Sequence, residues 1–117
     1  MVISELLIYF RILNVEITFI SDPADDVAVN AATCSGLLNP GDDCTLTCMA
    51  SGGNPQDYSY AWRFRHMYED RFEAVTGATS ADFVLQSAMD SDAGTYGCRV
   101  TNAGGVSSAA LDIYVLC

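Results

Sequence analysis

The stretch DSDAGTYGC (residues 90–98) carries four unlike side chains at every second position: Asp92, Gly94, Tyr96 and Cys98. Alternate residues of a strand share one face, so the tyrosine and the cysteine lie on the same side of an extended segment. The four residues form neither a nucleophile with its base nor a metal cage. The spacing predicts a turn that leads into a half-buried strand.

Length and charge narrow the class of protein. The 117 residues suit a single domain, and half of them are apolar, which is enough to build one core. The net charge is −10 with only five basic residues. Nucleic acids and anionic membranes attract basic surfaces, so we expect neither as a partner.

The five cysteines predict an oxidising compartment. The chain has no CxxC pair and a single histidine, His66, so the usual zinc spacing is missing and we expect no metal or cofactor. Many cysteines in a chain this short indicate disulfides. The odd count leaves one thiol free or linked to another chain, and Cys117 is the candidate for a linked dimer.

Short apolar runs alternate with turn residues about every ten positions, which predicts an all-β sandwich or barrel without helices. We interpret residues 1–14 as a leading segment of uncertain origin and residues 15–117 as the domain. The expected strands are 15–20, 27–30, 44–50, 58–68, 81–88, 94–102 and 106–116.

Several motifs in the chain resemble the immunoglobulin superfamily over residues 15–116. Cys48 and Cys98 both have inward parity, and the only tryptophan, Trp62, lies between them. The motifs GDDCTLTC (41–48), AWRF (61–64) and CRVTNAGG (98–105) agree in order. The resemblance is strongest to the I-set, because Asn102 and Gly105 follow the second cysteine and the interval from Trp62 to Cys98 is short. It implies a sandwich of two antiparallel sheets with about seven to nine strands.

The resemblance also assigns structural roles. It implies a Cys48–Cys98 disulfide between the sheets, covered by Trp62, and a hydrogen bond from Tyr96 to nearby backbone. Gly94 permits the turn, and Asp92 accepts from turn amides or pairs with an arginine, for which Arg71 is the candidate. Leu46 and Leu85 complete the expected core.

The loop 31–43 is longer than the family's usual turn and adds Cys34. The topology of the family gathers Cys34, Cys44 and Cys117 at one pole, so a second bridge among the three is expected. Cys34–Cys44 is the most local choice, and the two pairings with Cys117 stay open.

Function is inferred from the family resemblance. It implies a non-enzymatic recognition or adhesion module, one of several tandem domains of an extracellular or cell-surface protein, that binds a protein partner or itself. The contact surface is either the outer face of the sheet that holds Trp62 and Cys98 or the loops at either pole, first of all the polar loops 51–59 and 101–107, which meet at one pole. The candidate contact residues in these loops are Asn54, Gln56, Asp57, Tyr58, Asn102 and Gly104.

Two other functions stay open. A variable-type immune receptor domain, which binds antigen or a non-self ligand, would be favoured by two additional short strands between Phe64 and Thr76. An intracellular structural domain of the muscle-protein kind requires reduced cysteines throughout. An enzyme is not expected, because no catalytic set of residues is present in the sequence.

Overall fold

The computed structural model describes residues 21–116, which form eight strands and one short 3-10 helix. The expected strand 15–20, the leading segment 1–14 and Cys117 lie outside the described residues. The elements are β1 (Asp26–Ala31), β2 (Leu37–Leu38), β3 (Cys44–Ser51), β4 (Ser59–His66), β5 (Glu73–Ala74), β6 (Asp82–Leu85), η1 (Asp90–Asp92), β7 (Gly94–Asn102) and β8 (Gly105–Val115).

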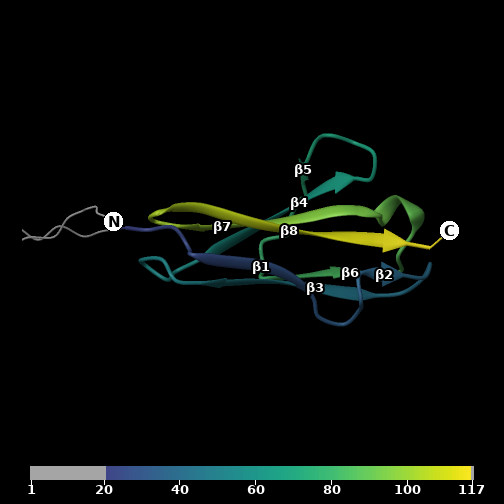
Figure 1. Cartoon of the computed structure of the whole chain (residues 1–117), viewed down its shortest axis with the longest axis horizontal. Coiled ribbons are helices and arrows are strands. Elements are labelled where there is room, and N and C mark those ends of the chain that lie inside the picture. Colours follow the sequence, from purple (N-terminus) through teal and green to yellow (C-terminus); the bar gives the residue numbers. More distant parts are fainter. Residues whose placement is uncertain (1–20, 117) are drawn as a thin grey trace, which may run out of the picture.

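Two sheets pack face to face, as predicted for an all-β sandwich. One sheet has the strand order β1-β3-β6 and the other β2-β8-β7-β4-β5. Figure 1 shows the layers edge-on, with β1 and β3 in one layer and β7 and β8 in the other. Every pairing is antiparallel except that of β2 with β8, which is parallel. The chain therefore moves from one sheet to the other between β1 and β2.

The core lies between the sheets and follows the alternation of the strands. In β3, Cys44, Leu46 and Cys48 are buried, whereas Met49 faces solvent. Trp62 is 1% exposed and lies at the centre. The other large buried side chains come from both sheets: Leu38, Leu85, Tyr96, Val100 and Ile113. Leu46 and Leu85 thus occupy core positions.

The structure corrects three details of the expected elements. β2 lies inside the stretch 31–43, which we expected to be a loop, and η1 is helical although no helix was predicted. β4 and β6 end before the predicted limits 68 and 88, because the backbone of Tyr68 and Ser87 adopts positive φ angles of 70° and 49°. Such angles belong to turns and interrupt extended structure.

Candidate functional site

The interlayer disulfide joins β3 to β7. The sulfurs of Cys48 and Cys98 lie 2.15 Å apart, and Trp62 is the direct neighbour of Cys98 in the β4–β7 register. The Trp62 indole donates its Nε1 hydrogen to the Ser80 carbonyl at 2.8 Å. The buried ring therefore has its polar group satisfied.

The stretch 90–98 forms a closed turn. The Tyr96 hydroxyl donates to the Asp92 carbonyl at 2.6 Å, and the Asp92 carboxylate accepts from the Met89 amide at 2.9 Å. Burial, with a smaller contribution from the Asp92 charge, raises the pKa of the Tyr96 phenol above its usual value. Within residues 21–116, no ion pair joins Asp92 to the suggested partner Arg71.

Gly94 is required at the start of β7 by a close backbone approach. A Cβ atom there would lie 2.2 Å from the Arg65 carbonyl oxygen on the neighbouring strand. Real Cβ atoms do not approach oxygen this closely, so the position excludes every residue with a side chain.

A second disulfide links Cys34 to Cys44, with the sulfurs 2.02 Å apart. It ties the connection between β1 and β2 to the start of β3. The connection then hydrogen-bonds to β8, where the Tyr114 amide donates to Gly36 at 2.9 Å and the Leu116 amide to Leu38 at 2.8 Å. The bridge thus fixes the segment in which the chain changes sheets.

Loops 51–59 and 101–107 meet at the pole where the described residues begin, but Asn102 is not available to a partner. It is 8% exposed, and its amide nitrogen donates to the Asp22 carbonyl at 2.7 Å and the Pro55 carbonyl at 2.8 Å. Its oxygen accepts from the Gly104 amide at 2.9 Å. Asn102 therefore ties three segments together.

The other candidate loop residues divide into two groups. Tyr58 donates its hydroxyl to the Gly52 carbonyl at 2.6 Å, and Gly104 packs so tightly against the Asp22 backbone that a Cβ there would overlap it. Asn54, Gln56 and Asp57 are exposed, which leaves them on the surface of this pole.

The outer face of the five-stranded sheet carries three rows of side chains across β4, β7 and β8. The pairings place Ala61 with Arg99 and Ser108 in the first row, Arg63 with Gly97 and Ala110 in the second, and Arg65 with Thr95 and Asp112 in the third. These residues alternate with the buried ones, so their side chains point away from the core.

Only the third row contains an acid. Arg65 donates to the Thr95 hydroxyl at 3.1 Å, and that hydroxyl donates to the Asp112 carboxylate at 2.6 Å. Among residues 21–116, no carboxylate pairs with Arg63 or Arg99. On β8, the small residues Ala110 and Ser108 occupy the places that correspond to Asp112.

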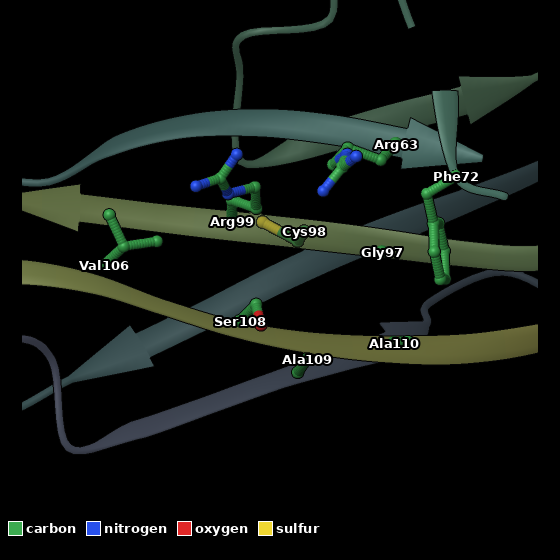
Figure 2. A pocket seen from close by; sticks show the side chains of 9 residues that line it. All are labelled: Arg63, Phe72, Gly97, Cys98, Arg99, Val106, Ser108, Ala109 and Ala110. Carbon is green, nitrogen blue, oxygen red and sulfur yellow. The ribbon is translucent and has the colours of Figure 1, made fainter. Parts of the chain in front are cut away.

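The first two rows border a hollow of about 450 Å³. Figure 2 shows Arg63 and Arg99 pointing to the same side of the sheet, with Phe72 at one end of the hollow and Val106 at the other. The guanidinium carbons of Arg63 and Arg65 lie 5.8 and 5.5 Å from the centre of the Phe72 ring, within the range of cation–π interactions. We call this surface, formed around Gly97 and Ala110, the arginine hollow.

This sheet face was predicted as a contact surface, but the residues of the hollow were not. The available signal was the alternation RFR (63–65) followed by Arg99 in a chain with only five basic residues. The positions that face these arginines depend on the register between β4, β7 and β8, which the sequence did not provide.

The family model for the immunoglobulin domain matches residues 32–102, which include the sheet-switching segment, both disulfides and Trp62. The chain belongs to the immunoglobulin domain family. No curated protein sequence matches it.

Solved structures of other immunoglobulin domains share the fold. The mouse nectin-like molecule 4 full ectodomain (Ig1–Ig3) matches with a TM-score of 0.57 and 26% identity, over 81% of this chain and 30% of that one. The N-terminal four Ig domains of Dscam1 isoform 6.9 match at 0.57 and 18% identity, over 77% and 21%. Murine CEACAM1b matches at 0.58 and 17% identity, over 80% and 46%. The chain thus spans less than half the length of each of these structures.

The part of the chain from residue 21 to 116 holds no group of three or more His, Cys, Asp or Glu side chains arranged for a metal ion. The same residues include no helix with the length and apolar character needed to cross a membrane.

Proposed function

We propose that this immunoglobulin domain is a non-enzymatic recognition module of an extracellular or cell-surface protein, with protein contact through the outer face of its five-stranded sheet. The observation that carries the proposal is the arginine hollow, where Arg63 and Arg99 rim a depression without a carboxylate partner among the described residues. A rigid sheet presents such groups in fixed positions, which lowers the entropic cost of binding.

The proposed compartment rests on the disulfides. Two bridges within about one hundred residues suit an oxidising environment. They weigh against an intracellular muscle-type domain, which would keep its thiols reduced. We further propose that residues 15–117 form one of several tandem domains, as in the multi-domain structures that it resembles, and that Cys117 is the residue through which two chains could be linked.

The proposed subtype is the I-set. Between Phe64 and Thr76, the structure contains a single short additional strand, β5, where the variable type has two. The short interval from Trp62 to Cys98 supports the same assignment. This favours general protein recognition over antigen binding by the loops.

The test is a binding screen with the full chain joined to a pentamerising tag to raise avidity. The pentamer is applied to an array of extracellular ectodomains that includes the chain itself, with the tag alone as control. We expect saturable binding to at least one ectodomain, and the untagged monomer should compete for it.

The thiol state is measured on the chain recovered from its native source. Mass mapping without reduction should find Cys34, Cys44, Cys48 and Cys98 in disulfides. Free thiols at all four positions, or an array without any ectodomain bound above the control, would contradict the proposed role.

A further inference from the structure

We propose that the arginine hollow binds an acidic segment of a different protein, with the Arg63 and Arg99 guanidinium groups each taking a carboxylate and an apolar side chain of the partner filling the space over Gly97 and Ala110. This rests on the proposed recognition function and adds the chemistry of the partner. The charge of the three rows, the shape of the hollow and the charge of the whole chain each support it.

The three rows provide an internal comparison. They share one sheet and one register, and each contains an arginine on β4 or β7. In the third row Arg65 donates to the Thr95 hydroxyl, which in turn donates to Asp112, whereas the first two rows offer their arginines only Ser108 or Ala110 on β8. A carboxylate is therefore the group that the first two rows lack and the third row has. Arginine binds carboxylates in a bidentate geometry that fits this role.

The spacing of Arg63 and Arg99 suits an extended segment. Arg63 lies opposite Gly97, and Arg99 follows two residues later on the same face, so the two are diagonal neighbours at roughly 7–8 Å between Cα atoms. Alternate side chains of an extended peptide are separated by nearly the same distance, about 7 Å. One peptide strand can therefore present a carboxylate to each arginine.

The hollow also has apolar surfaces. The small residues Gly97 and Ala110 form the floor of the hollow and leave space above it. A Cβ added at Gly97 would already contact the Phe72 ring at 3.5 Å. Phe72 closes one end, and Val106, which is 49% exposed, closes the other. An apolar side chain of the partner would be enclosed between them and would strengthen binding by the area that it buries.

Charge favours a different protein over a second copy. If two copies met symmetrically through this face, they would place Arg63 and Arg99 close to the same arginines of the other chain. Each copy also has a net charge of −10. An acidic segment avoids the repulsion between arginines. Salt at physiological concentration, with a Debye length of about 8 Å, screens the segment from the chain's more distant acidic residues.

The test uses the full chain and two capped pentapeptides, acetyl-Asp-Ser-Asp-Ser-Phe-amide and its neutral analogue acetyl-Asn-Ser-Asn-Ser-Phe-amide, in which the first, third and fifth side chains share one face of an extended chain. Binding is followed by nuclear magnetic resonance through the backbone amide signals of Gly97, Arg99 and Ala110. We expect the acidic peptide to shift these signals in a saturable way and to bind at least tenfold more tightly than the neutral one, because charge-assisted hydrogen bonds exceed neutral ones in strength.

Variants locate the binding. Arg63→Ala and Arg99→Ala should each weaken the acidic peptide about tenfold, the loss of one charged hydrogen-bonded contact. Arg71→Ala is the matched control, because it removes the same charge from an exposed residue outside the three rows. Ala110→Asp puts a carboxylate into the second row at the β8 position that Asp112 has in the third, so it should repel the acidic peptide and abolish its binding without loss of the fold.

Four results would overturn the proposal: equal affinity for the two peptides, an Arg71→Ala effect equal to that of Arg63→Ala, full binding by Ala110→Asp, or acetate bound at this site as tightly as the peptide. Self-association through these residues, detected by sedimentation, would also overturn it in favour of a second copy. If an ectodomain from the array binds Arg63→Ala and Arg99→Ala as well as it binds the unchanged chain, the recognition function stands and only the partner chemistry fails.

Discussion

Asn102 illustrates how one side chain fixes three chain segments. Its amide group donates to Asp22 and Pro55 and accepts from Gly104, so both N–H donors and the carbonyl oxygen of the buried group have partners. A buried amide with this pattern positions loops and is costly to replace.

We predict that Asn102→Ala lowers the free energy of unfolding by about 2 kcal/mol, because it leaves buried carbonyl groups without their donor. Asn102→Asp should cost at least as much, since it sets a carboxylate oxygen against two carbonyl oxygens. Urea unfolding measures both variants, with the exposed neighbour Thr101→Ala as control. If Asn102→Ala is as stable as Thr101→Ala, the hydrogen bonds of Asn102 to the three segments do not contribute to stability.

Tyr96 predicts a loss of stability at alkaline pH. Its pKa in the folded protein is raised, whereas a tyrosine in the unfolded chain ionises near pH 10. Above about pH 10 the unfolded state therefore binds fewer protons than the folded state, and stability falls as the pH rises. Below that pH the contribution is fully present.

The measurement is the urea midpoint as a function of pH. Tyr96→Phe should flatten the alkaline decline and should cost about 1 kcal/mol at neutral pH through the lost bond to Asp92. Tyr68→Phe is the control, because Tyr68 is 98% exposed. An unchanged alkaline slope in Tyr96→Phe would assign the decline to other groups.

A residue's role can be predicted from the sequence when its partners are close to it along the chain. The Tyr96 hydroxyl bonds to Asp92, four positions away, within one recognisable motif. Asn102 was instead grouped with contact residues, because its partners Asp22 and Pro55 are 80 and 47 positions away. A polar residue in a loop reveals its burial only when distant segments are in place.

At the scale of elements, the Cys34–Cys44 bridge determines how firmly β2 joins β8. We predict that the double variant Cys34→Ala and Cys44→Ala costs about 3 kcal/mol, the entropic value for closing a loop of ten residues. Hydrogen exchange should accelerate most at the Tyr114 and Leu116 amides, which bond to the β2 segment. Amides between β4 and β7 should change only as much as global stability does. Uniform acceleration would show that the bridge has no local role.

The strands were predicted with uneven success, for a physical reason. β7 has the predicted limits 94–102, because alternation over nine residues is a strong signal. β2 was missed, since Leu37 and Leu38 alone carry no periodicity and pair only because β8 is already positioned. The arginine hollow was missed for the same reason, as it depends on the register of three strands.

For the whole molecule, we expect the two sheets to unfold together. The Cys48–Cys98 bridge and Trp62 lie between them, so neither sheet keeps a buried face without the other. Tryptophan fluorescence and far-ultraviolet circular dichroism should therefore give coincident urea transitions.

Removing the interlayer bridge with Cys48→Ala and Cys98→Ala should lower the free energy of unfolding by about 4 kcal/mol, the entropic value for a loop of 50 residues, and move both transitions to lower urea. The double variant Cys34→Ala and Cys44→Ala serves as the comparison and should lose less. Separate transitions for the two probes would mean that each sheet is stable alone.

The positions of the arginines influence how a partner protein is oriented as it approaches the domain. The arginines of the described residues belong to β4, β7 and the stretch between β4 and β5, in a chain with a net charge of −10. An approaching anionic protein is therefore attracted most strongly where Arg63 and Arg99 face it, and its field turns this sheet face toward it. Fewer collisions are then wasted on wrong orientations.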